Sequence, residues 1–277
     1  MLSESDRRFI YEQAHIPEHL LHYVSSVTGA EPHLYGGHVL YVKDGTLVLV
    51  GYPLQQRFEK EKLADLLELA AKEFHPRTLS LLAPSIPPWR KPSSEIIEDV
   101  YYRLELEHLK LSGKVRNMIT RASRELSCDL GRELSDEHLR LIREFSKRPD
   151  VEDASRRIFS KVPEYVSHAS TSLVWNSKDE EGNLLAFTVA EYGAKDYGFY
   201  MFHFRTKDRA APGASDLLLR EAIREAARQG KTYMNLGLGM NRGVAFFKEK
   251  WGATPFLPYA TCTYTFVRPL LFSALGI

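Results

Sequence analysis

The fold is decided by the stretch YGFYMFHFRTKDRAAPGASDLLLREAIREAARQG (197–230), followed by TYMNLGLG (232–239) and NRGVAFFKEKWGA (241–253). The hydrophobic pattern predicts a strand at 197–205, a polar turn at 206–214 and a helix at 215–230. A short strand, a Gly-rich turn and a second helix follow. A small-residue turn that leads from a strand into a helix N-terminus is a typical site for a phosphate-bearing ligand.

Composition limits the classes of protein to consider. The chain has 277 residues, is 44% hydrophobic and 26% charged, and carries a net charge of +1 from 37 basic and 36 acidic residues. A sizeable core is expected, and a dedicated duplex-nucleic-acid binder is not. Cys128 and Cys262 lack metal-type spacing, so neither a metal site nor a disulfide framework is expected. We find no signal peptide and no apolar run of membrane-spanning length, which predicts a cytoplasmic protein.

Segments outside this stretch alternate between helical and strand patterns. A hairpin is predicted at 38–52 with Asp44-Gly45 at its turn, a helix at 59–74, and strands at 78–84 and 100–109. A strand meander is predicted over 170–205. Because both halves contain a hairpin, a helix and a further strand, we expect an α/β protein of two related modules. The expected division is 1–106 and 107–277, with a basic connecting helix at 110–125.

The turn before helix 215–230 is the first candidate binding site. Gly213 and Ala214 would let a ligand approach the backbone, and Arg209 would add a positive charge to that of the helix N-terminus. The alternative is an ordinary loop in which Ser215 caps the helix.

Residues 170–265 resemble the GNAT superfamily of N-acyltransferases. The resemblance rests on the element order, on Arg209 and Ala214 in the phosphate-binding turn, and on Leu217-Leu218 in the helix that follows. It implies two GNAT-like modules, each a mixed, mostly antiparallel sheet flanked by helices, with coenzyme A as co-substrate. Its donor-binding residues here would be Arg209, Gly213, Ala214, Ser215, Asn235 and Asn241. Pro212, which has no N–H, replaces the usual Gly, and Lys248 replaces the usual tyrosine.

These two departures look more like the Fem-type branch, whose tandem GNAT-like proteins transfer aminoacyl groups from tRNA to amines. Lys248 would then support the donor or the leaving group; the alternative is a solvated lysine on an amphipathic helix. Asn235 and Asn241 follow or flank the second strand and could contact the donor or the acceptor. Asn241 could equally be a helix N-cap.

Two side chains are candidates for handling the proton of an acceptor amine. Glu191 ends a mostly apolar strand, and burial there would raise its pKa toward neutrality. His203 lies in the strand 197–205. The alternatives are a solvent-facing carboxylate at the strand end and a hydrogen-bonded core histidine.

The basic helix 110–125 offers Lys114, Arg121 and Arg124 to phosphates of tRNA or coenzyme A, although such a run can also be a solvated face. The GNAT resemblance implies an N-acyltransferase that moves an acyl group from acyl-CoA to a small-molecule or peptide amine. Fem-type transfer from aminoacyl-tRNA and a non-catalytic GNAT-like binding protein are the alternatives.

Overall fold

The computed structural model describes residues 2–207 and 211–266, and the chain forms two compact units. Of the described residues, unit 1 comprises 31–98 and 259–266, and unit 2 comprises 2–30 and 99–258. This division crosses the contiguous halves 1–106 and 107–277, because the first 29 described residues pack with the later unit. That those halves are two modules of related design stays a prediction.

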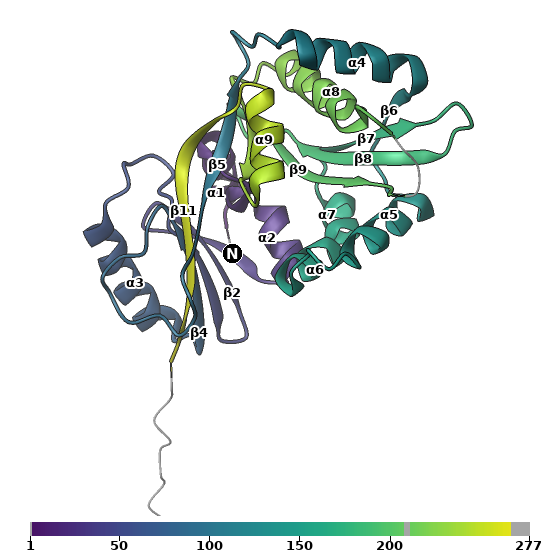
Figure 1. Cartoon of the computed structure of the whole chain (residues 1–277). Coiled ribbons are helices and arrows are strands. Elements are labelled where there is room, and N and C mark those ends of the chain that lie inside the picture. The colour runs from purple at the N-terminus through teal and green to yellow at the C-terminus, as the bar shows by residue number, and fades with distance from the viewer. Residues whose placement is uncertain (1, 208–210, 267–277) are drawn as a thin grey trace, which may run out of the picture. The chain divides into compact units, whose positions relative to one another are not determined.

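Unit 1 is a sheet with one long helix against it (Figure 1). Its elements are β1 (Glu31–Tyr35), β2 (His38–Lys43), β3 (Thr46–Val50), α3 (Lys60–Phe74), β4 (Thr78–Ala83) and the end of β11 (Thr254–Thr265). The strand order is β1-β2-β3-β4-β11, and only the β3–β4 pair is parallel. Asp44 and Gly45 have the positive φ values, 47° and 79°, expected for the β2–β3 turn.

Unit 2 holds most of the candidate residues. Its N-terminal part comprises α1 (Glu4–Gln13), the 3-10 turn Pro17–His19 and α2 (Leu21–Thr28). β5 (Ile97–Glu105), α4 (Gly113–Glu125), β6 (Ser127–Gly131), α5 (Asp136–Ser146), α6 (Asp153–Ser160) and α7 (Val162–His168) follow. The remaining elements are β7 (Ser172–Lys178), β8 (Leu184–Glu191), β9 (Tyr197–Arg205), α8 (Ala214–Arg228), β10 (Tyr233–Leu238) and α9 (Arg242–Lys250).

The unit 2 sheet has the strand order β5-β10-β9-β8-β7-β6, and only β9 and β10 run parallel. Alternate side chains of its strands enter two hydrophobic clusters. Leu173 and Ala190 pack with α4 and α8, whereas Val174, Phe187 and Val189 pack with α5 and α7. Figure 1 shows α4 and α8 on one side of β7–β9 and α5–α7 on the other. Helices therefore cover both faces of this sheet.

Local sequence signals explain several element boundaries. Asn241 accepts hydrogen bonds from the N–H groups of Gly243 and Val244 and so caps α9. His138 takes the place of the usual Glu in the capping box of α5, because its Nδ1 accepts from the Ser135 N–H at 3.0 Å.

The expected fold class, α/β with mixed, mostly antiparallel sheets flanked by helices, is confirmed.

Candidate functional site

The parallel pair β9–β10 is the geometric centre of the candidate site. The two strands are hydrogen-bonded only at their start, where Tyr233 pairs with Tyr197 and Asn235 with Phe199. Within the described residues the pairing stops there, although β9 continues to Arg205 and β10 to Leu238. On its other side β10 carries an irregularity between Asn235 and Leu238 in its pairing with β5. Strands that part in this way leave backbone N–H and C=O groups without a ladder partner between them.

His203 joins β9 to the start of α8. Its Nε2 lies 2.8 Å from the Ser215 Oγ, and its Nδ1 lies 3.0 Å from the Thr188 Oγ1. The Tyr200 ring stacks on the imidazole with a centroid distance of 6.1 Å. Burial, reinforced by Arg205 and Arg148, lowers the pKa of His203 to about 4, so the ring is neutral at pH 7. The neutral imidazole can hold the Thr188 and Ser215 hydroxyls in place, but its low pKa makes it a weak base.

Lys248 extends from α9 toward the irregular part of β10. It is only 5% exposed, and its ammonium donates to the carbonyl oxygen of Leu238 and lies 5.7 Å from the centre of the Tyr102 ring. Burial lowers the pKa of Lys248 to about 7, while Asp99 acts in the opposite direction. The alternative of a solvated lysine is therefore wrong. A buried amine that is half protonated near pH 7 can both donate and accept a proton.

A buried ion pair fixes the helix that carries Lys248. Asp216, in the first turn of α8, accepts from the Trp251 Nε1 at 2.7 Å and from the Lys250 ammonium. Asp216 is 4% exposed and Trp251 1% exposed. The start of α8 and the end of α9 are thus held together, and this contact was not predicted. Asp216 lies in the first turn of α8, so its sequence context indicated only a favourable charge near a helix N-terminus.

Glu191 lies at the end of β8 inside a shell of donors. Its carboxylate accepts from the Tyr165 hydroxyl at 2.9 Å, from the Thr171 hydroxyl, and from the N–H groups of Tyr192 and Gly193. The side chain is 2% exposed, and burial raises the pKa of Glu191 despite these four hydrogen bonds. The alternative of a solvent-facing carboxylate is therefore wrong. Burial raises the pKa of Glu191 as expected, and four protein donors bind the carboxylate.

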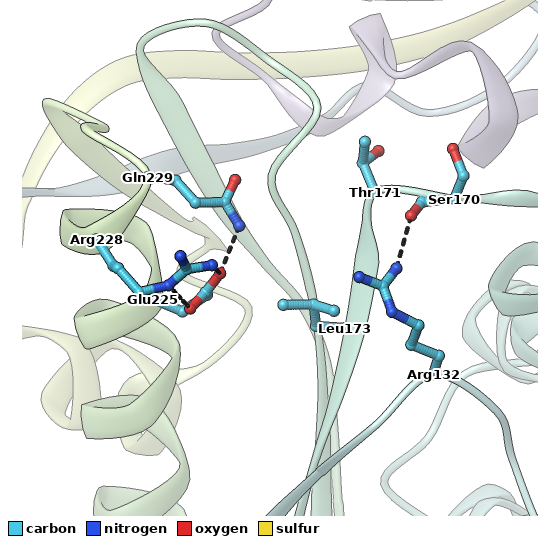
Figure 2. Close-up of a pocket in the computed structure, with 7 residues that line it drawn as sticks. All are labelled: Arg132, Ser170, Thr171, Leu173, Glu225, Arg228 and Gln229. Carbon is cyan, nitrogen blue, oxygen red and sulfur yellow. Dashed lines mark hydrogen bonds and ion pairs between the residues drawn. The ribbon is translucent and has the colours of Figure 1, made fainter.

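A pocket of about 170 Å³ lies next to Glu191 and is shown in Figure 2. Thr171, whose hydroxyl binds Glu191, is one of its lining residues. Arg132 donates to the Ser170 carbonyl oxygen on one wall, and Glu225 accepts from Arg228 and Gln229 on the other. Glu191 therefore lies behind Thr171, and the polar groups drawn in the pocket mostly bind one another.

The two asparagines are engaged in local structure. Asn235 is fully buried; its amide donates to the His15 carbonyl oxygen at 2.9 Å, and its Oδ1 accepts from the Gly237 N–H at 2.8 Å. Asn241 caps α9, as the alternative interpretation held. Contact of either residue with a donor stays a prediction, and these hydrogen bonds do not support it.

The start of α8 is covered by α4. Gly213 has φ +82°, and a Cβ built on it would lie 2.9 Å from the Ala122 Cβ and 3.1 Å from the Met118 carbonyl oxygen. The Ala214 N–H donates to the Ala211 carbonyl oxygen, and Ala214 is buried. Arg209 lies outside the described residues. The glycine is thus needed where one helix approaches another, and a phosphate cradle at Gly213, Ala214 and Ser215 stays a prediction.

The basic residues of α4 point away from the core. Lys114, Arg121 and Arg124 are exposed, whereas Val115, Ile119 and Ala122 of the same helix are buried. Of the three, only Arg121 has a carboxylate partner among the described residues, Glu125 at 3.6 Å. This face can meet a polyanion without losing buried contacts.

Residues 2–207 and 211–266 contain neither a metal-ligand group nor a membrane-spanning helix. Across these ranges, no three His, Cys, Asp or Glu side chains come together as a metal-ligand group. None of the helices there is both long and apolar enough to cross a membrane.

Three solved structures have a similar fold. FemX has a TM-score of 0.63 at 11% identity, with 94% of this chain and 96% of FemX covered. The C-terminal domain of a putative lysylphosphatidylglycerol synthetase from Agrobacterium fabrum has a TM-score of 0.60 at 13% identity, covering 93% and 91%. A tandem GNAT protein from the clavulanic acid biosynthesis pathway has a TM-score of 0.50 at 14% identity, covering 88% and 87%. At these identities the likeness shows a GNAT-like fold alone.

No curated protein matches the sequence. One family does match, over residues 35–271, and its description is "Phosphatidylglycerol lysyltransferase, C-terminal". The match supports a transferase, whereas coenzyme A as co-substrate is not confirmed. Because it covers most of the sequence, the chain belongs to the family of phosphatidylglycerol lysyltransferase C-terminal domains.

Proposed function

We propose that the chain transfers an aminoacyl group from aminoacyl-tRNA to the hydroxyl of a lipid such as phosphatidylglycerol. The observation that carries the proposal is the family match over residues 35–271, whose description names this acceptor and a lysyl group. It replaces acyl-CoA by the tRNA donor that the sequence left as an alternative. The acceptor changes from an amine to a lipid hydroxyl.

The reaction exchanges one ester for another. The acceptor hydroxyl attacks the aminoacyl carbonyl carbon, the bond from that carbon to the ribose oxygen breaks, and the hydroxyl proton ends on the ribose oxygen. Because the new and old bonds are both esters, catalysis consists mainly of positioning the two substrates and of moving one proton.

Lys248 is the residue that we assign to this proton. Its pKa of about 7 leaves a large neutral fraction at physiological pH, so the amine can accept the acceptor's proton and return it to the leaving oxygen. The protonated form can instead stabilise the oxyanion of the tetrahedral intermediate. The location supports this role, since Lys248 contacts Leu238 on the strand that parts from β9.

Exposed side chains on α9, just before it and on α4 are suited to binding the two proposed substrates. Met240 and Phe246, 63% and 67% exposed, lie just before and on α9, the helix that carries Lys248. Large exposed apolar side chains are suited to the acyl chains of a lipid. On α4, the exposed Lys114, Arg121 and Arg124 are suited to the phosphates of a tRNA.

The test is a transfer assay with radiolabelled lysyl-tRNA and vesicles that contain phosphatidylglycerol. Label should move into the lipid fraction, and Lys248→Met should lower kcat by about 10²-fold or more. Lys147→Met, at an exposed lysine after α5, is the matched control. Changing Lys114, Arg121 and Arg124 together to Glu should raise KM for the tRNA.

A second candidate is acyl transfer from coenzyme A, as the sequence predicted. Its support is the parallel β9–β10 pair that parts next to the start of α8, in a fold shared with a tandem GNAT protein. Acyl-CoA turnover that survives the triple Glu variant, without any lipid labelling from lysyl-tRNA, would favour this candidate over the first.

A further inference from the structure

Two arginines, Arg148 and Arg205, meet at the end of β9. Arg148 follows α5, and Arg205 is the last residue of β9. The Arg148 Nη2 lies 3.4 Å from the Arg205 carbonyl oxygen, and its guanidinium lies 4.2 Å from the centre of the Phe145 ring. The Arg148 Nε is buried and has no hydrogen-bond partner among the described residues. Arg148 is thus held in place by its neighbours while part of its donor capacity is unused.

Among the described residues the local charge is positive and no carboxylate pairs with it. Within residues 2–207 and 211–266, no carboxylate oxygen lies within 4.0 Å of either guanidinium, and the charge of Asp150 acts on Arg148 only from farther away. Burial and the Arg205 charge both lower the pKa of Arg148. The same two arginines lower the pKa of His203. Adjacent like charges and a buried unpaired N–H are unfavourable unless an anion joins them.

We propose that Arg148 and Arg205 bind a phosphate group, and that it is a phosphodiester of the donor RNA near its aminoacylated end. Two guanidinium forks offer the planar, charge-assisted donors that phosphate oxygens accept best. The identity of the RNA rests on the proposed function, whereas phosphate binding itself does not.

The surroundings favour RNA over a lipid headgroup. Large exposed apolar side chains occur on α4, on β6 and around α9, including Met118, Leu130, Met240 and Phe246. None of the described residues of α5, α6 or β9 belongs to this set. A phospholipid bound at Arg148 and Arg205 would therefore find no large, highly exposed apolar side chain on the described residues of these elements for its acyl chains.

The phosphate site is tested by calorimetric titration of the full chain with inorganic phosphate at constant ionic strength. Saturable binding is expected, weakened about tenfold or more by Arg205→Gln. Arg148→Lys, which keeps the charge but loses the fork, should also weaken binding. Arg143→Gln, at an exposed arginine of α5, is the matched control and should bind as the wild type does. Equal affinities for all of these proteins, or no binding by the wild type at millimolar phosphate, overturn the site.

The source of the phosphate is tested with a short single-stranded RNA over a range of salt concentrations. Arg205→Gln should reduce the slope of log K against log salt by about 0.7 for one lost phosphate contact, and Arg143→Gln should not. An unchanged slope, or a loss of binding to phosphatidylglycerol vesicles in its place, overturns the RNA assignment. If the wild type transfers no lysine, the proposed function fails, while the phosphate titration remains a separate result.

Discussion

The Nε2 of His203 and the Oγ of Ser215 lie 2.8 Å apart, and this contact links the C-terminal end of β9 to the first turn of α8. Because the imidazole is enclosed and two arginines lie near it, its pKa is lowered to about 4. An unfolded histidine has a pKa near 6.5, so the unfolded chain binds more protons than the folded chain between these values. Stability must therefore fall as the pH drops from 6.5 toward 4.

We expect His203→Gln to remove this acid sensitivity. The slope of the unfolding free energy against pH should decrease by up to about 1.4 kcal/mol per pH unit over that window. Urea unfolding at several pH values measures the slope, and His108→Gln, at an exposed histidine, is the control. An imidazole NMR signal of His203 that titrates near pH 6.5 would contradict the prediction and restore His203 as a candidate base.

Lys248 should make stability depend on pH in the same direction, but between neutral and alkaline pH. Its folded pKa of about 7 lies below the unfolded value near 10.4, so the unfolded chain again binds more protons between the two. Stability should rise with pH from about 7 to 10, and Lys248→Met should lose that rise, at about 1.4 kcal/mol per pH unit. Denaturant titrations of wild type, Lys248→Met and Lys147→Met measure it. Parallel curves for all three proteins would show that the amine is solvated.

Glu191 should matter for stability more than a surface carboxylate does. Glu191→Ala leaves the hydroxyls of Tyr165 and Thr171 and two backbone N–H groups without their acceptor. Each unsatisfied buried donor costs about 1–3 kcal/mol, so we expect a loss of about 3 kcal/mol or more. Glu191→Gln keeps an acceptor oxygen and should cost less. If Glu191→Gln folds stably but loses transfer activity, Glu191 acts in catalysis and not only in the shell that holds it.

Gly213 and Gly182 form a matched pair for testing the approach of α4 to α8. Both have positive φ, 82° and 84°, but an added Cβ meets Ala122 and Met118 at Gly213 and nothing within 4 Å at Gly182. Gly182→Ala should cost only the backbone strain, about 1 kcal/mol, whereas Gly213→Ala should cost 1–3 kcal/mol more. Thermal unfolding of the two variants gives the difference. Equal losses would mean that α4 can move away from α8 without cost.

Periodic patterns in the sequence predicted the elements but not their partners. The apolar spacing of 59–74 and 215–230 predicted α3 and α8 to within a residue or two, because amphipathic periodicity depends on one helix alone. The surroundings of Lys248 and Glu191 include groups 10 or more residues away in sequence, among them the Leu238 carbonyl oxygen and the Tyr165 hydroxyl. The local spacing of residues does not predict such contacts, so the sequence left open that Lys248 and Glu191 are solvated.

A glycine in the sequence likewise does not reveal which group packs against it. The sequence predicted that Gly213 lets a ligand approach the backbone, and this stays a prediction; in the structure a Cβ at Gly213 would meet Ala122 and Met118. The approaching group is α4, however, because a glycine reports that space is scarce and not what fills it. Arg148 and Arg205 gave no signal at all, since they lie 57 positions apart in the sequence and meet only where α5 ends against β9.

The strand β11 carries a consequence for the order of events during synthesis. Residues 260–265 pair with β4, yet they are synthesised after every residue of unit 2. The edge of β4 that pairs with β11 therefore stays unpaired while about 160 residues (99–258) are synthesised. The folding of unit 1 must finish late, and a nascent chain that stops before residue 259 should expose that edge to other strands.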